Sequence, residues 1–309
     1  MSLTLQILVS GLAAGSVYGL VAVGQTLVFR LTGIVHFALG DLVGLGVFVT
    51  LLVTAGRGPV TQASASSWRF ALALLVGLAV TAALSSGSYA AFVHPYMARG
   101  STVGWVAASV AIAFAIESLL RVLFIRPAYV FPDPFPFHRV GNGGIVTVGG
   151  ATFQLRSVFV IALGVVLAVA FSLVITRTRF GRGLQAIAQD SDGAQIVGVP
   201  HDPYIGRAFA LVGALAALIA VAAAPSGPFT VTTGALLGLK GLVAALVVGF
   251  SDPIRAYVAG LVLGVVEAAI ASGEISGHAI GPAYREVLPL AFVLILLAIR
   301  TRTRVPEPE

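Results

Sequence analysis

The sequence has no cysteine and very little charge. Its 309 residues include 18 basic and 12 acidic side chains, so that charged residues make up 10% of the chain, whereas soluble domains carry about 25%. The absence of cysteine excludes a disulfide scaffold. The low charge, together with 58% hydrophobic residues, excludes an ordinary soluble enzyme and a disordered chain. The composition is that of a polytopic membrane protein.

The sequence also lacks the motifs of nucleotide, metal and acyl chemistry. The nearest approach to a phosphate-binding loop, residues 234–241, has the wrong glycine spacing and no hydroxyl side chain after its lysine to hold magnesium. None of the five histidines forms a metal-ligand spacing with another, and no serine lies in a nucleophile elbow. We therefore expect no enzymatic activity, no metal site and no cofactor in this chain.

What the sequence does contain is long apolar segments. A bilayer core requires about 20 apolar residues per helix, and the alternating pattern of a membrane β-barrel is missing. The sequence predicts an all-α bundle of eight or nine transmembrane helices in a single domain, residues 1–300, followed by a tail at 301–309. The count depends on whether residues 33–55 form a full span or a re-entrant piece. The nine candidate windows are residues 5–29, 33–55, 70–93, 102–124, 157–176, 204–224, 234–250, 256–272 and 284–300.

Arginines between the apolar windows indicate the orientation. The two dense clusters, residues 177–182 and 300–304, are expected on the cytoplasmic side because inner loops are enriched in positive charge. This places the C-terminus inside and the N-terminus outside. The first window is interpreted as a retained span and not as a signal peptide, since no basic residue precedes it and Arg30 follows it.

Two connecting segments are long enough to have structure of their own. The outer loop, residues 126–156, contains prolines that forbid helix and then two short β-prone runs around Gly149 and Gly150, which predict a small extracytoplasmic β-hairpin. The inner loop, residues 177–203, predicts two short amphipathic helices. Asp190 or Asp192 would cap the second helix and Gly198 would close it.

Glycines recur at four-residue spacing in several apolar windows, as small residues do where helix backbones approach closely. We expect tight helix packing at these positions, with a backbone-lined passage as the alternative. The positions are Gly11, Gly15 and Gly19, Gly40 and Gly44, and Gly260 and Gly264.

Four ionisable residues lie within the predicted spans, where a charge at the bilayer centre costs at least about 2.5 kcal/mol. Glu117 is expected to pair with Arg121, four residues later on the same helix face. Lys240 and Glu267 lie on successive spans and would meet either as a structural bridge or as part of a passage. For Asp41 a passage or gate role is favoured over helix capping, because an interrupted helix is expected between His36 and Asp41.

Three stretches of the chain resemble the LivH-type permeases of bacterial branched-chain amino-acid ATP-binding-cassette (ABC) importers. The opening resembles that family at residues 11–24 (GLAAGSVYGLVAVG) and 31–41 (LTGIVHFALGD). Residues 180–190 (FGRGLQAIAQD), followed by Ala194 and residues 197–199, resemble its segment for engaging the ATPase. Residues 238–250 (GLKGLVAALVVGF) and 260–267 (GLVLGVVE) are similar to its late spans.

The resemblance implies an importer with two homologous permease chains, two ABC ATPase subunits that hold ATP and magnesium, and an extracytoplasmic solute-binding protein. The chain would lie in the bacterial inner membrane and carry branched-chain amino acids or a related small polar solute by alternating access. Residues expected in the translocation path or gate are His36, Gly40, Asp41, Lys240 and Glu267. Residues expected to couple to the ATPase are Gly181, Arg182, Leu184, Ala186, Ala188, Asp190, Ala194, Val197 and Gly198.

The chain departs from the family pattern at two places. The family has Asn-Phe-Ala-His-Gly-Glu at residues 36–41, and a glycine pair where this chain has Gly249 and Phe250. Branched-chain amino acids are therefore the default cargo and not a deduction. Two other functions stay open: a secondary transporter with Asp41, Lys240 and Glu267 as an ion relay, and a membrane-embedded enzyme or assembly subunit.

Overall fold

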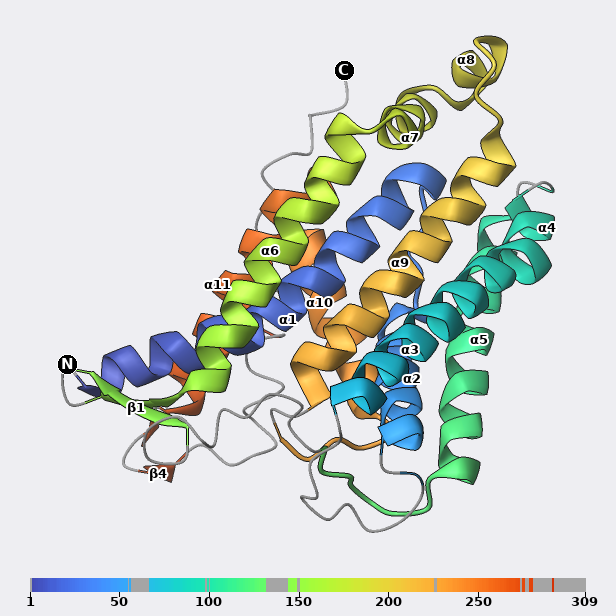
Figure 1. The fold of residues 1–309 in the computed structure, drawn as a ribbon. Helices are drawn as coiled ribbons and strands as arrows, with labels where there is room; N and C mark the ends of the chain where they lie inside the picture. The colour runs from blue at the N-terminus through green and yellow to red at the C-terminus, as the bar shows by residue number, and fades with distance from the viewer. Residues whose placement is uncertain are drawn as a thin grey trace.

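Helices make up most of the protein in a computed structural model that describes residues 2–54, 56, 67–97, 99, 101–131, 144–148, 151–224, 227–272, 274–275, 278–279 and 291. Figure 1 shows them as a bundle with a small β-hairpin near the N-terminus. The α-helices are α1 (Ser2–Thr32), α2 (Leu39–Thr54), α3 (Ser67–Ser88), α4 (His94–Met97), α5 (Thr102–Leu123), α6 (Leu155–Arg177), α7 (Arg179–Gln189), α8 (Ser191–Ile196), α9 (His201–Ala223), α10 (Thr233–Val247) and α11 (Pro253–Ala271). A π-helical turn, η1 (Tyr89–Val93), joins α3 to α4, and the strands are β1 (Ile145–Val148), β2 (Ala151–Gln154), β3 (Glu274–Ile275) and β4 (His278–Ala279).

The prediction of an all-α membrane bundle is confirmed. Within the described residues, six helical segments are long and apolar enough to cross a membrane, and two further apolar helices, α2 and α10, are shorter. These eight segments fall in eight of the nine predicted windows. The ninth window, residues 284–300, lies outside the described residues apart from position 291.

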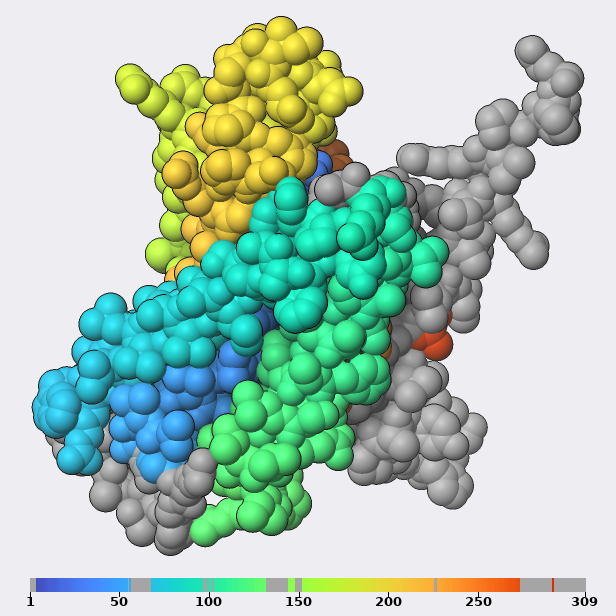
Figure 2. Space-filling view, turned by 90° about the vertical axis from the view of Figure 1, so that its right-hand side faces the viewer, coloured from blue at the N-terminus to red at the C-terminus, as the bar shows by residue number. Residues whose placement is uncertain are grey.

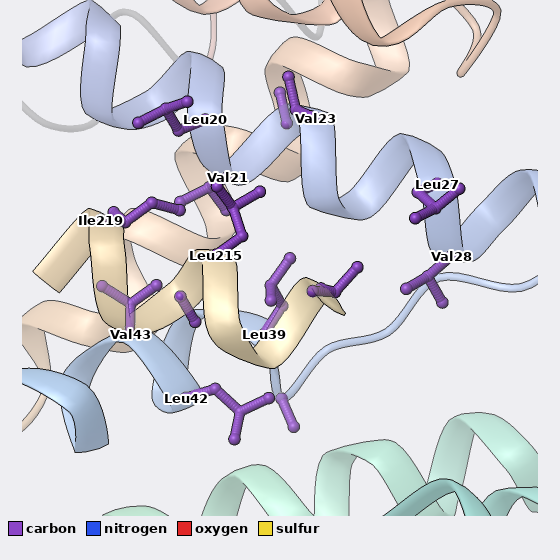
Figure 3. Packing of buried hydrophobic residues seen from close by; sticks show 14 of the residues in the cluster. Leu20, Val21, Val23, Leu27, Val28, Leu39, Leu42, Val43, Leu215 and Ile219 are labelled. Carbon is purple, nitrogen blue, oxygen red and sulfur yellow. The ribbon is translucent and has the colours of Figure 1, made fainter. Parts of the chain in front are cut away.

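The helix α1 lies at the centre of the bundle and packs against α6, α9, α10 and α11. Its middle part is apolar and buried, so that it contributes much of the hydrophobic core. Figure 3 shows Leu20 and Val21 of α1 beside Leu215 and Ile219 of α9, with Leu39, Leu42 and Val43 of α2 on the other side of α9. Two successive helices and a third that is distant in sequence therefore share one core.

The predicted glycine faces are sites of close backbone contact. A Cβ atom added at Gly15 in α1 would lie 2.7 Å from the Leu261 Cα atom of α11, and one added at Gly11 would lie 2.6 Å from the Val265 Cα atom. Real Cβ atoms do not approach backbone this closely, so that only glycine permits this α1–α11 contact.

The short helices α2 and α10 meet at their N-terminal turns. A Cβ atom added at Gly40 would lie 2.6 Å from the Gly238 Cα atom, and one added at Gly234 would lie 2.9 Å from the Gly44 Cα atom, which makes the crossing antiparallel. With 16 and 15 residues, the two helices are each only about 22 to 24 Å long. Residues 33–38 before α2 are non-helical, so that the predicted window 33–55 is a loop, buried at His36 and Ala38, followed by a short helix.

The two predicted loop structures lie at opposite ends of the bundle. The β-hairpin is confirmed: β1 and β2 pair antiparallel, with Ile145 opposite Gln154. Gln6 near the start of α1 donates a side-chain hydrogen bond to the Thr152 hydroxyl of β2 at 2.8 Å. Figure 1 places α7 and α8 at the other end, and Figure 2 shows the region of α8 as a projection beyond the layer formed by α3 and α5. We call α7 and α8 together the α7–α8 projection.

Candidate functional site

The predicted contact between Lys240 and Glu267 is present. The Lys240 Nζ atom of α10 lies 2.7 Å from Glu267 Oε1 of α11 and 3.2 Å from the Tyr18 hydroxyl of α1. The Lys240 ammonium also lies 5.0 Å from the centroid of the Tyr18 ring, where a cation–π contact is favourable. This cluster links three helices inside the bundle. Tyr18 was not predicted from the sequence, because a tyrosine in an apolar helix is ordinary.

Asp41 lies at the junction of the two short helices. It belongs to the first turn of α2, is 4% exposed, and forms no ion pair within the described part of the chain. The N-termini of α2 and α10 meet beside it, and the partial positive charges of helix N-termini stabilise a carboxylate there. Asp41 can therefore stabilise the start of α2 and also face a passage from the same position.

A cavity of about 210 Å³ lies next to this junction, between α1, α2, α5 and α10. Its polar lining consists of Gln25, Asp41 and Glu117, and the rest is mainly apolar, including Phe114 and Leu242. We call it the acidic cavity. The expected pair on α5 is confirmed, since the Arg121 Nε atom lies 3.2 Å from Glu117 Oε1. The sequence placed Asp41 and Glu117 in separate spans without predicting that they line one cavity.

His36 and Gly40 lie in packed surroundings. The His36 side chain is fully buried against Phe209, with ring centroids 5.3 Å apart, and neither ring nitrogen has a hydrogen-bond partner among the described residues. Its carbonyl accepts a hydrogen bond from the Gln25 amide at 2.9 Å. Gly40 supplies the close approach of α2 to α10. Both residues therefore hold the junction together and do not line the acidic cavity.

A second cavity, of about 390 Å³, lies toward the hairpin end between α1, α6 and α10. Its lining includes Tyr18, Thr233 and Arg156. Arg156 is one of the arginines counted as loop charge in the sequence, yet it is 6% exposed and donates to the Val221 carbonyl at 3.0 Å. Carbonyls at a helix C-terminus attract cations, which explains how α9 accommodates this arginine. Hydropathy alone did not reveal it.

The α7–α8 projection is built by two side-chain caps. The Thr178 hydroxyl accepts from the Gly181 amide at 2.9 Å and starts α7, and the Asp190 carboxylate accepts from the amides of Asp192 and Gly193 and starts α8. Gly198 follows with φ of +84°, a conformation that favours glycine. Of the two caps that the sequence offered, Asp190 is the one used.

The nine predicted coupling residues differ in exposure. Gly181, Leu184 and Ala194 are buried against the chain's own residues, whereas Arg182, Asp190, Val197 and Gly198 are exposed, and Ala186 and Ala188 are intermediate. At the tip, Ile196 and Val197 are 86% and 75% exposed. Such exposed apolar side chains on a projection are typical of a protein contact surface. Ile196 was not among the residues selected from the sequence.

The whole chain matches a known protein family. Residues 7–297 match the family described as branched-chain amino acid transport system, permease component. The chain belongs to this family. The permease is 25% identical to the high-affinity branched-chain amino acid transport system permease protein BraD of Pseudomonas aeruginosa and 23% identical to LivH of Escherichia coli K12, covering 99% of this chain and 96% of each relative.

Another relative carries a different description. The permease is 26% identical to the nucleoside ABC transporter permease protein NupC of Lactococcus lactis, over 86% of this chain and 83% of that protein. Family membership and the helical spans make the chain a multi-pass membrane protein and a transport subunit of ABC type. The resemblance to LivH-type permeases found in the sequence is confirmed.

Proposed function

We propose that this permease forms the translocation path of an importer for branched-chain amino acids. One observation carries the proposal: the short helices α2 and α10 meet by their N-terminal turns inside the bundle, with one cavity beside the junction and a second cavity along α10. Secondary transporters place their binding sites where short or broken helices meet near the bilayer midplane, and we apply the same geometric argument to this permease. Irregular backbone at such depth, here residues 33–38, is typical of segments that line a passage or are buried in protein.

Within this path, the charged residues have distinct roles. Asp41 faces the acidic cavity, and the bridge between Lys240 and Glu267 ties α10 to α11 while Tyr18 lines the second cavity. Breaking and reforming this bridge would let α10 move relative to α11. His36 and Gly40 would fix the junction around which the path opens, so that their role is in gating.

The α7–α8 projection is proposed as the docking surface for an ABC ATPase subunit. Phe180 of α7 stacks on Tyr204 of α9 with ring centroids 5.5 Å apart, and α9 packs against α2. A push on Ile196 and Val197 by a closing ATPase would therefore be transmitted through α9 to the helix that carries Asp41. This is the alternating-access change expected of an importer driven by ATP.

We propose an assembly that is consistent with this arrangement. The projection end would face the cytoplasm with the C-terminus, and the hairpin end would receive an extracytoplasmic solute-binding protein. A second homologous permease and two ATPase subunits, which hold ATP and magnesium, would complete the importer. The names of BraD and LivH support branched-chain amino acids as cargo, and the name of NupC points to nucleosides as the competing class.

Purification of the tagged permease from its native membrane in mild detergent tests this proposal. We expect ATPase subunits and a second permease to co-purify in stoichiometric amounts, and the complex with its binding protein to import leucine into liposomes only with ATP. A chain that purifies alone and transports under an ion gradient would make the secondary transporter correct.

A variant at the projection separates the same two mechanisms. Replacing Val197 by Trp adds bulk at the tip of the projection, where the side chain is 75% exposed, and should abolish leucine uptake by blocking ATPase docking. A gradient-driven carrier would be almost unaffected. The matched control is Val166→Trp on the lipid side of α6, where the side chain is 62% exposed.

A further inference from the structure

The acidic cavity is bordered by two carboxylates but only one guanidinium. Glu117 is paired with Arg121, whereas Asp41 has no ion pair among the described residues. The carboxylates of Asp41 and Glu117 line the same cavity. With both carboxylates ionised, the group of two carboxylates and one guanidinium has a net charge of −1. A single positive charge in the cavity would neutralise it, and neutralisation is strongly favourable at membrane depth.

Gln25 supplies an independent observation that points to a ligand. Its side chain is 1% exposed and lines the cavity. The amide nitrogen donates to the His36 carbonyl, but the Oε1 atom has no hydrogen-bond partner among the described residues. A buried acceptor without a donor is costly, so that native proteins rarely leave one unsatisfied.

The chemistry of the lining favours an ammonium group over a metal ion. The cavity offers three acceptor groups, one amide oxygen and two carboxylates. Their number matches the three N–H donors of an ammonium group. A hard cation such as calcium requires six to eight oxygen ligands, and the remaining wall consists of carbon atoms of residues such as Val110, Phe114 and Leu239. An apolar wall of this kind suits an aliphatic side chain.

We infer that the acidic cavity binds the α-ammonium group of an aliphatic amino acid on its way through the permease, with Gln25, Asp41 and Glu117 as acceptors. The inference rests on the proposed function, because it assumes that the cargo is an amino acid. It adds the residues that recognise one end of that cargo.

Binding to the purified complex of permeases and ATPases, without the binding protein, tests the inference. The probes are 3-methylbutylamine, which is leucine without its carboxylate, 4-methylpentanoate, which is leucine without its ammonium, and sodium chloride. We expect the amine to bind and to raise the thermal unfolding midpoint of the wild-type permease, whereas the carboxylate probe should not. In Asp41→Asn the dissociation constant of the amine should rise at least about tenfold, since a charged hydrogen bond is lost.

Two further variants keep the test decisive. Asp252→Asn is the matched control, because Asp252 caps α11 away from the cavity and asparagine caps helices equally well; it should bind the amine like the wild type. If Asp41→Asn does not fold, Glu117→Gln takes its place in the test. We expect Glu117→Gln to raise the dissociation constant of the amine as well.

Three outcomes would overturn the inference: no binding of the amine, equal amine binding by Asp41→Asn or its substitute, or equal stabilisation by sodium chloride, which would indicate a free-cation site. Leucine import by the complete wild-type complex is measured separately. Amine binding without leucine import would show that the proposed cargo is wrong while the ammonium site stands.

Discussion

The bridge between Lys240 and Glu267 is a buried charge pair whose partners depend on each other. The Lys240 residue is 8% exposed, and its ammonium lies 2.7 Å from Glu267 Oε1. Lys240→Met or Glu267→Gln would leave the other charge unpaired, and breaking such a pair costs about 3 kcal/mol. We expect each single variant to lower the thermal unfolding midpoint and leucine uptake, and the double variant to recover part of the midpoint. Additive losses in the double-mutant cycle would exclude the coupling.

At the residue scale, the sequence predicted charge pairs better than neutral contacts. Ionisable residues in apolar spans require partners, and this reasoning predicted the contacts of Glu117 with Arg121 and of Lys240 with Glu267. Gln25 and Tyr18 were missed because neutral side chains in apolar helices carry no distinctive signal. Their importance comes from which helices pack beside them, and that is a tertiary property.

At the scale of helices, the contact of α1 with α11 depends on the absence of side chains at Gly15. A Cβ atom there would lie 2.8 Å from the Gly260 carbonyl oxygen and 2.7 Å from the Leu261 Cα atom. Because both neighbours are backbone, Gly15→Ala must push the helices apart, and such overpacking costs about 1 to 3 kcal/mol. We expect a lower unfolding midpoint and less monodisperse protein in size-exclusion chromatography.

Gly77→Ala in α3 is the matched control for this prediction. A Cβ atom at Gly77 would meet the Thr50 hydroxyl oxygen at 3.6 Å, an ordinary contact. Alanine is the better helix former by about 1 kcal/mol, so that this variant should be as stable as the wild type or more stable. Equal destabilisation by the two substitutions would mean that close backbone contact is not the reason for Gly15.

Hydropathy predicted the existence of the helices more accurately than their ends. The second window was expected from residue 33, whereas α2 begins at Leu39. Residues 33–38 are apolar enough to extend the window, and a hydropathy pattern does not distinguish burial in protein from burial in lipid. By contrast, Gly198 closes α8 as predicted and Asp190, one of the two predicted caps, starts it, because caps act through local hydrogen bonds and backbone conformation.

The packing of the helices against one another could not be predicted from the sequence. A long helix followed by a short one occurs twice, as α1 with α2 and as α9 with α10, and the pairs pack crosswise so that α2 contacts α9 and α10 contacts α1. Crosswise packing brings the N-termini of α2 and α10 together. Each helix can be predicted from its own residues. The junction of α2 with α10 cannot, because it depends on contacts between residues about 200 positions apart in the chain.

The orientation of the whole molecule is testable because the chain has no cysteine. Single cysteines introduced at Ile145, on the hairpin, and at Val197, on the projection, would each be the only reactive thiol, and both positions are well exposed at 48% and 75%. A membrane-impermeant maleimide should label Ile145→Cys in intact spheroplasts and Val197→Cys only after permeabilisation. Val166→Cys, on an exposed apolar face of α6, should resist labelling in both, because lipid or the second permease would exclude water there and maleimides react with the hydrated thiolate.

The reverse labelling pattern would contradict more than the orientation. If Val197→Cys were labelled from outside, the α7–α8 projection would face away from any cytoplasmic ATPase, and the proposed coupling through α9 to α2 would be impossible. The arginines of residues 177–182, at the start of α7, would then lie on the outer side, against the positive-inside rule. The labelling of one residue at each end of the bundle therefore decides whether charge distribution, docking surface and transport direction agree.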